Sequence, residues 1–405
     1  MDNLFTVMHT SAEEHLEIGG EYDVVVIGGG IAGVAAALSA ARSGKSVLII
    51  EKGVMLGGLA TMGLITWYLP LCDGYGRKII SGIAEELLYK SIECGYDTLP
   101  EEWRGGPAYV EKASSRYLTR FSPSEFVAVL DEMMQQEHID LIFDTVFTAP
   151  VMENGICRAV IVEEKGGRKV YLGKVFIDAT GDCDLAYRAG GDTELFDNWC
   201  SYWVYNTDLD MMQKALETGH IIDAFDVHQY GDSPMPGNDK GKKMIIKDAK
   251  GVTEFVLRGR KYLLDDLRRM GKSNTHCTTT IPAMAQVRTT RRLIGAYTLT
   301  TDDLNTHFDD SVGAVSDWRF AGPLYEIPYR CLYTPQLKNI LASGRCISAT
   351  GDTWEVTRVI PPAALTGQAC GTAAAMMIEA SAAADQVNIK ELQEKLSAAG
   401  VLIHF

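Results

Sequence analysis

Residues 24–52 read VVVIGGGIAGVAAALSAARSGKSVLIIEK. An apolar β-branched run ends at a glycine cluster, a stretch of small residues follows, and a second apolar run ends at an acidic residue. Runs of these kinds are typical of a βαβ unit, which implies a parallel sheet. The predicted elements are a strand over 22–27, a turn over 28–30, a helix over 31–43 and a strand over 46–51.

The glycines of the turn have the spacing GxGxxG, with Gly28, Gly30 and Gly33 in the three positions. In a dinucleotide site the first glycine permits the tight turn, the second lets the backbone approach a pyrophosphate, and the third lets the helix pack on the strand. Glu51, at the end of the second strand, would accept hydrogen bonds from a ribose. A tight strand-to-helix turn without a ligand needs similar glycines, but the helix, second strand and carboxylate in register favour dinucleotide binding.

The segment that follows the carboxylate indicates which dinucleotide is bound. Residues 51–63 read EKGVMLGGLATMG and contain a second glycine pair, Gly57 and Gly58, followed by Thr61 and Gly63. A nicotinamide dehydrogenase normally enters its next helix here, whereas a longer cofactor needs more backbone at close approach. The sequence therefore predicts FAD.

The rest of the chain predicts an α/β protein with two domains. The predicted FAD-binding domain is Rossmann-like, with a parallel sheet and a three-stranded β-meander before residue 180, and an α+β substrate or cap domain is inserted into it. Residues 1–20 are weakly patterned and predict an irregular arm. Further helices are expected over 81–94, from Ser122 and Pro123 onward, and over 207–218, 254–270 and 284–297. The domains are expected at 21–63, 120–190 and 335–405 (FAD-binding), 64–119 (a connecting segment near the flavin) and 191–334 (inserted).

Composition narrows the function classes. The chain has 405 residues and a formal net charge of −15, which would repel a phosphate backbone, so nucleic acid is not an expected partner. Nine cysteines without a CxxC pair or a Cys/His cluster indicate neither a disulfide scaffold nor a metal site. The uncharged run 24–41 follows an acidic segment and contains glycines, so no membrane span is predicted and a cytoplasmic location is expected.

Further along the chain, KVFIDATGDCDLAYRAGG (174–191) ends an apolar strand at Ala179, and LASGRCI (341–347) and RVIPPAALTGQACGTAAAMM (358–377) lie near the C-terminus. With these motifs the chain resembles FAD-dependent oxidoreductases of the glutathione-reductase-like superfamily, over about residues 22–377. The resemblance implies that the cofactor is bound by Gly28, Gly30, Ile31, Ala32, Gly33, Glu51, Lys52, Gly57, Gly58, Thr61, Gly63, Val146, Ala179, Thr180, Gly181, Gly344, Arg345, Pro361, Gly367 and Gln368.

The resemblance also gives a role to the helix that begins after Arg358. In such proteins the N-terminus of the last helix faces the flavin pyrimidine ring and stabilises negative charge there. Ala363, Ala364, Gly367 and Gly371 would then leave room for the ring. The alternative is an alanine-rich helix packed in the core.

Disulfide reductases of this superfamily have a second glycine-rich βαβ motif and a redox CxxC, and the sequence has neither. Electrons are therefore expected from a small-molecule substrate or from a partner protein, and a homo-oligomer is also compatible with the sequence. The predicted reaction is hydride transfer between the substrate and flavin N5. Two alternatives are a non-redox flavin enzyme similar to thiazole synthases and an electron-transfer subunit.

Four residues are candidates for the substrate side. Arg358 stands where related succinate and aspartate oxidases have an arginine that handles the substrate. Arg288 and Arg292, predicted on one helix face beside Arg291, would hold a carboxylate or join the two domains by salt bridges. His276 is a candidate for proton transfer, although a lone histidine is more often structural. An anionic substrate is compatible with these arginines.

Overall fold

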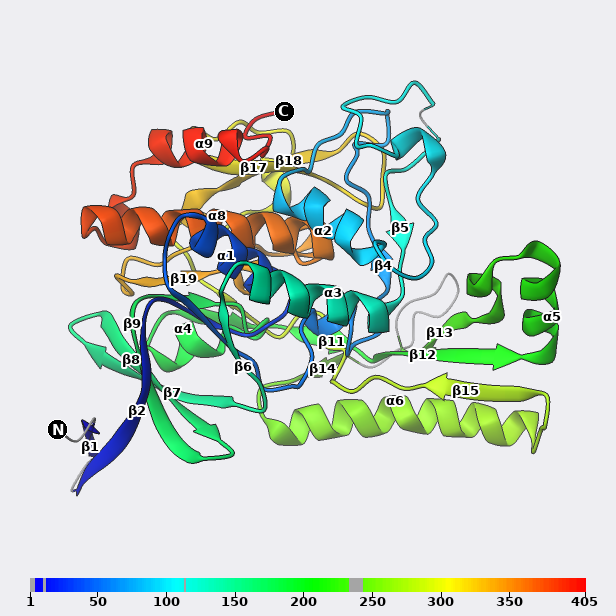
Figure 1. Ribbon diagram of the computed structural model, residues 1–405, viewed down its shortest axis with the longest axis horizontal. Helices are drawn as coiled ribbons and strands as arrows, with labels where there is room; N and C mark the ends of the chain where they lie inside the picture. Colours follow the sequence, from blue (N-terminus) through cyan, green and yellow to red (C-terminus); the bar gives the residue numbers. More distant parts are fainter. Residues whose placement is uncertain (1–3, 10–11, 113, 233–242) are drawn as a thin grey trace.

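The computed structural model describes residues 4–9, 12–112, 114–232 and 243–405 of the chain. An eight-stranded sheet has the order β6-β3-β2-β9-β8-β7, with β1 on β2 and β19 on β9 (Figure 1). Its strands are β1 (Leu4–His9), β2 (Ala12–Ile27), β3 (Val47–Ile50), β6 (Asp140–Ile142), β7 (Val146–Glu153), β8 (Ile156–Glu164), β9 (Gly167–Asp178) and β19 (Ile340–Ala342).

The parallel part of this sheet confirms the predicted βαβ unit. Val24–Ile27 of β2 pair in parallel with β3 on one side and with the end of β9 on the other. β6 and β19 extend the parallel pairing outward. Because parallel strands end at the same edge, the loops that follow β2, β3, β9 and β19 lie together there, the usual position of a ligand in such a sheet.

The β-meander is also confirmed, since β7, β8 and β9 pair in antiparallel order. The prediction of an irregular arm over residues 1–20 is wrong, because β2 begins at Ala12 and pairs with β1. Backbone hydrogen bonds hold these strands together, so the segment needs no strong side-chain pattern.

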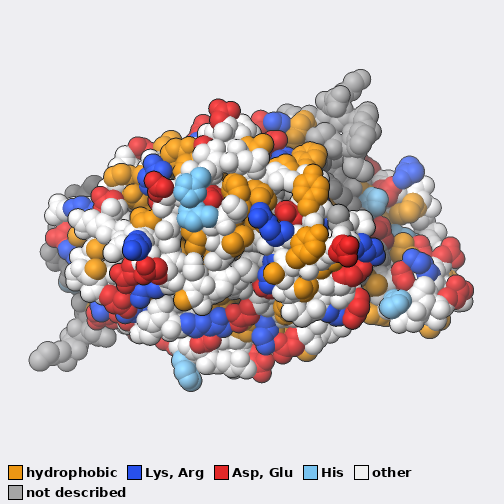
Figure 2. All heavy atoms as spheres, turned by 90° about the horizontal axis from the view of Figure 1, so that it is seen from above, with side chains coloured by type: hydrophobic (Ala, Val, Ile, Leu, Met, Phe, Trp, Pro, Cys, Tyr) orange, Lys and Arg blue, Asp and Glu red, His pale blue; other side chains and the backbone are white. Residues whose placement is uncertain are grey.

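Nine α-helices are present in the described residues. They are α1 (Ile31–Arg42), α2 (Ile83–Ser91), α3 (Pro123–Gln136), α4 (Asp184–Arg188), α5 (Leu209–Thr218), α6 (Ala249–Met270), α7 (Asp352–Thr357), α8 (Ile360–Ala380) and α9 (Ile389–Ala398). None of the helices that the structure describes has the length and apolar character needed to cross a membrane. Acidic and basic side chains are intermixed on the face seen in Figure 2.

The small residues of α8 pack against α1, and the two helices lie side by side in Figure 1. A Cβ on Gly367 would lie 2.2 Å from the Ala32 carbonyl oxygen, and one on Gly371 would lie 2.2 Å from that of Ala36. The prediction that these two glycines make room for a flavin ring is therefore wrong. They permit close approach of two helix backbones in the core, the alternative considered for this segment.

Small sheets make up much of the remaining strand structure. β12 (Ser201–Asp208) lies between β13 (Asp226–Gly231) and β15 (His276–Thr280), and α6 packs along this sheet at the lower right of Figure 1. The other pairs are β4 (Trp67–Tyr68) with β5 (Thr119–Arg120), β10 (Thr193–Leu195) with β16 (Arg291–Leu293), β11 (Asp197–Trp199) with β14 (Lys243–Ile245), and β17 (Ser311–Ser316) with β18 (Leu324–Pro328).

Two helices predicted in the inserted segment are confirmed as α5 and α6, but the helix predicted over 284–297 is absent. The Asn198 Oδ1 accepts hydrogen bonds from the backbone N–H groups of Arg288 and Thr289, and β16 pairs with β10. These tertiary bonds replace the intrahelical ones, so Arg288 and Arg292 do not share a helix face. The domain boundaries remain predictions. β17 and β18 belong to the segment 191–334 that is predicted as the inserted domain, yet they bury side chains in the same core cluster as α1 and α8.

Candidate functional site

A cavity of about 630 Å³ opens at the edge where the parallel strands end, a volume in the range of ligand sites. Its wall includes main-chain and side-chain groups from the turns after β2, β3, β9 and β19 and from the start of α6. The predicted residues that line it are Gly28, Gly30, Ile31, Ala32, Glu51, Lys52, Gly57, Gly58, Val146, Ala179, Thr180, Gly181, Gly344, Arg345 and Arg358.

The three glycines of the first turn differ in what surrounds them. Gly28 has φ +104°, and a Cβ there would lie 2.5 Å from the Ala179 carbonyl oxygen. A Cβ on Gly33 would lie 1.9 Å from the Gly28 carbonyl oxygen, so this glycine serves packing within the turn. Gly30 lines the cavity, and a Cβ there would have no atom of the described residues within 4 Å. The free space at Gly30, next to the N-terminus of α1, fits a bound pyrophosphate.

The carboxylate of Glu51 is held by backbone donors on both oxygens. The Gly29 N–H donates to Oε2 at 2.7 Å, and the Gly53 N–H donates to Oε1 at 2.6 Å. The side chain is only 6% exposed and lines the cavity. These bonds fix the carboxylate beside the glycine turn while leaving lone pairs for a ribose hydroxyl.

The second glycine pair is joined to the first turn. The Gly57 N–H donates to the Gly29 carbonyl at 2.8 Å, and Gly57 and Gly58 have φ values of +92° and +56°. Thr61 and Gly63 do not line the cavity, because the Thr61 hydroxyl donates to the Leu56 carbonyl and Gly63 packs on Leu59. From the same loop, Leu59, Ala60 and Met62 form the wall instead.

The residues Arg345 and Arg358 line one part of the cavity, and the charge of each acts on the nearby Arg288. Arg345 lies 3.5 Å from an Asp182 oxygen and donates to the Val287 carbonyl, while Arg358 pairs with Glu355. The Arg358 Nε is buried and has no hydrogen-bond partner in the described part of the chain. Burial, followed by the positive charges of Arg358 and Arg345, lowers the pKa of Arg288 to about 9. An anion at this position would reduce the repulsion among the three arginines.

Acidic and basic groups also line the cavity near α4. Arg291 pairs with Asp184 at 3.2 Å and lies over the Tyr187 ring. Burial, together with the negative charges of Asp182 and Asp178, raises the pKa of Asp184 to about 6.

Several predicted site residues lie elsewhere. Arg292 is buried and pairs with Glu194 at 2.5 Å, which accounts for it structurally. His276, on β15, is not part of the cavity wall. The Gln368 side chain accepts a hydrogen bond from the Ile83 N–H and thereby joins α8 to α2. The predicted residues outside the wall are Gly33, Thr61, Gly63, Pro361, Gly367, Gln368, His276, Arg288 and Arg292.

Part of the wall carried no signal in the sequence. Residues 246–249, Val252 and 283–285 line the cavity from the segment predicted as the inserted domain. They belong to the start of α6 and to irregular backbone, and the long-range contacts that bring them to the glycine turns have no local pattern. One such contact is the Ala283 N–H, which donates to the Met62 carbonyl at 2.9 Å.

The family described as FAD dependent oxidoreductase matches residues 23–202 and 200–396 of the chain. This match covers the glycine turns, the strand ends and α8, so the cofactor is FAD. The free space at Gly30 and the fixed carboxylate of Glu51 fit that group.

Individual relatives match over shorter stretches. Digeranylgeranylglycerophospholipid reductase of Methanoculleus marisnigri is 29% identical over 183 residues, which is 42% of each chain. Vinyl phenol reductase of Lactiplantibacillus plantarum is 62% identical over 77 residues, 18% of this chain and 16% of the reductase. The matches therefore span less than half of these relatives.

Solved structures resemble this chain at low sequence identity. The p-nitrophenol 4-monooxygenase of Pseudomonas putida has a TM-score of 0.49 at 12% identity, covering 94% of this chain and 84% of that chain. A geranylgeranyl bacteriochlorophyll reductase-like protein of Thermoplasma acidophilum has a TM-score of 0.47 at 14% identity, covering 94% and 83%.

Proposed function

The chain belongs to the FAD dependent oxidoreductase family, and from this premise we propose that it oxidises or reduces a small anionic organic substrate beside the flavin. When bound, FAD supplies the redox chemistry by hydride transfer at N5 of its ring. The residues proposed to hold its ADP half are those of the two glycine turns and Glu51. Gly344, Arg345 and Ile360, which line another part of the cavity, are proposed to hold the flavin half. Membership of the glutathione-reductase-like superfamily is part of this proposal.

The observation that carries the anionic substrate is the group formed by Arg288, Arg345 and Arg358. Of these three arginines, Arg345 and Arg358 have a carboxylate at ion-pair distance in the described residues, and Arg288 has none. Charge-assisted hydrogen bonds from arginine to a carboxylate are strong and directional. A buried Arg358 Nε–H without a partner is costly unless a ligand accepts its hydrogen bond, so this group supports a role for Arg358 in binding the substrate.

A reduction screen tests the proposal. The FAD-loaded protein is mixed anaerobically with carboxylic acids and with matched neutral amides and alcohols, and loss of oxidised-flavin absorbance is followed. A second arm uses dithionite-reduced protein and monitors reoxidation by unsaturated acids and their amides. We expect an acid to react in one arm and its neutral partner to react at least about tenfold more slowly, because each charge-assisted bond contributes about 1.5 to 3 kcal/mol.

Arg358→Met should retain FAD and lose the preference for the acid. Arg330→Met is the matched control, because Arg330 pairs with Asp310 and lies outside the cavity wall. Equal rates for acids and amides in the wild-type protein, or an unchanged preference in Arg358→Met, would contradict the anionic substrate.

A further inference from the structure

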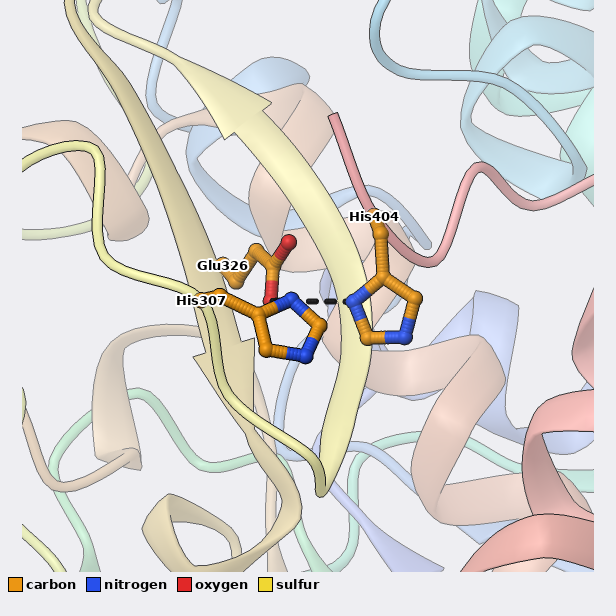
Figure 3. Close-up of side chains that lie close together, drawn as sticks. All are labelled: His307, Glu326 and His404. Atoms are coloured by element: carbon orange, nitrogen blue, oxygen red, sulfur yellow. Dashed lines mark hydrogen bonds and ion pairs between the residues drawn. The ribbon is translucent and has the colours of Figure 1, made fainter.

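A second group of chemistry-bearing side chains lies outside the FAD cavity. His307 precedes β17, Glu326 lies on β18, and His404 follows α9 near the end of the chain. Figure 3 shows the three side chains pointing toward one another. None of them lines the cavity, and the separations of 19 and 78 residues gave no metal-ligand spacing in the sequence.

The geometry of the group suits a metal ion. The Glu326 Oε2 lies 3.0 Å from the His404 Nδ1 and 3.5 Å from the His307 Nδ1, and one ligand atom from each residue lies within 4.8 Å of the others. In a tetrahedral zinc site with bonds of about 2.0 to 2.1 Å, ligand atoms are roughly 3.3 to 3.4 Å apart. The two measured distances fall on either side of that value.

In the described residues, Glu326 also lacks a permanently charged partner. Glu326 is 1% exposed, and within the described part of the chain no lysine or arginine lies at ion-pair distance from it. Its Oε2 accepts one backbone hydrogen bond, from the Phe308 N–H at 2.8 Å. A buried carboxylate is costly without a compensating charge. A divalent cation between Glu326 and the two imidazoles would provide that charge.

The neighbouring contacts hold the three side chains in place. The Asp309 carboxylate lies 3.4 Å from the His307 Nε2, and a proton on that nitrogen leaves the Nδ1 lone pair facing Glu326. The Ala314 N–H donates to the Leu402 carbonyl, and the Ser311 hydroxyl donates to the Ile403 carbonyl, which fixes the segment before His404. His307 is 62% exposed, so a fourth position is open to water.

We propose that His307, Glu326 and His404 bind one divalent transition-metal ion, with zinc the best match to two imidazoles and one carboxylate. The ion joins the loop before β17, strand β18 and the segment after α9. This site is independent of the FAD cavity, and the proposal does not rest on the redox function.

Zinc titration tests this proposal. Tag-free, FAD-loaded protein is stripped with a chelator, and zinc binding is measured by calorimetry and by metal analysis after gel filtration. We expect one zinc per chain and a rise in melting temperature. His307→Asn, His404→Asn and Glu326→Gln should each weaken binding at least about tenfold, because each removes one of three ligands. Cobalt should give the absorption of a tetrahedral site in the wild-type protein but not in these three variants.

His228→Asn is the matched control, because His228 lies 3.6 Å from Asp226 but belongs to no ligand group among the residues that the structure describes. This variant should bind zinc as the wild-type protein does. His307→Asn replaces an exposed side chain and keeps the test valid if Glu326→Gln does not fold, and the flavin spectrum reports folding. Absence of stoichiometric zinc, equal binding in all variants, or equal loss in His228→Asn would overturn the proposal.

Discussion

The glycine turns and the arginine group lie on the same cavity but are built in different ways. Around Gly30 and Glu51, much of the wall comes from the two glycine turns, and the bonds from the Gly29 and Gly53 N–H groups to the Glu51 carboxylate are local. Arg345 and Arg358 lie 57 and 70 residues after Arg288 in the chain, and side-chain charge dominates there. This contrast fits the proposal that the glycine side holds the cofactor and that the arginine side selects the substrate.

The largest effect is expected on the glycine side, from Gly30→Val. Its side chain would enter the free space beside the N-terminus of α1, so FAD binding should be lost while the fold is kept. Gly166→Val, in the exposed β8–β9 turn, is the control and should bind FAD normally. Equilibrium dialysis measures FAD binding, and far-UV circular dichroism checks the fold. A folded Gly30→Val protein with wild-type affinity would remove the glycine turn from the site.

A glycine-to-valine substitution on α8 should lower the stability of the fold instead. Gly367→Val places a side chain where the Ala32 carbonyl lies 2.2 Å from an ideal Cβ, so the α1–α8 contact must open. Overpacking of this kind costs about 1 to 3 kcal/mol or more of unfolding free energy. Chemical denaturation of the flavin-free proteins checks this. Unchanged stability together with a shifted flavin potential would restore the interpretation that Gly367 faces the ring.

Glu51→Gln probes the carboxylate of the glycine side. The amide keeps the shape but loses charge-assisted bonds, so FAD affinity should fall by about 1 to 3 kcal/mol. Fluorescence titration measures the change, and Glu21→Gln, which changes an exposed glutamate earlier on β2, is the control. An affinity equal to that of the wild-type protein would show that Glu51 does not contact the ribose.

A smaller effect is expected on the arginine side from Arg288→Met. Arg288 does not line the cavity, and removing its charge acts on Arg345 and Arg358 over a distance. The affinity for an anionic substrate should fall several-fold, or by about 1 kcal/mol, with FAD affinity unchanged. Initial rates of flavin reduction over a range of substrate concentrations report the affinity for the substrate, which is compared with the affinity for FAD. A loss of FAD of the same size would contradict the division between the two sides.

The smallest effect is a pH dependence from Asp184. Its pKa is raised to about 6 by burial and by Asp182 and Asp178, above an ordinary value of 3.8. A raised pKa in the folded state means that stability is lost as the pH rises from about 4 to about 6. Asp184→Asn should flatten this part of the profile of the flavin-free protein, measured by thermal unfolding. An identical profile in the variant would show that Asp184 does not titrate in this range.

The sequence predicted the glycine side well because its requirements are local. Gly28 needs a positive φ, Gly33 needs close packing, and Glu51 ends a strand, and each of these leaves a mark within one βαβ unit. The arginine side was predicted only in part. Arg358 was identified by resemblance. Arg288 and Arg292 were predicted on a helix that does not form, because the Arg288 N–H bonds to Asn198 and β16 pairs with β10.

Two further features had no usable local signal. The small residues of α8 have the same pattern whether they face a ring or another helix, and only the position of α1 decides between them. The His307–Glu326–His404 group is assembled from a loop, a strand and the end of the chain, so no short motif contains it.

The most direct test of the central claim is a comparison of FAD and FMN binding to the flavin-free wild-type chain. The glycine turns and Glu51 are assigned to the ADP half, which FMN lacks. The prediction is one FAD per chain, bound at least about 100-fold more tightly than FMN, a difference of about 2.7 kcal/mol or more. Equal affinity for FAD and FMN would show that the glycine side does not hold the ADP half, and would contradict the account.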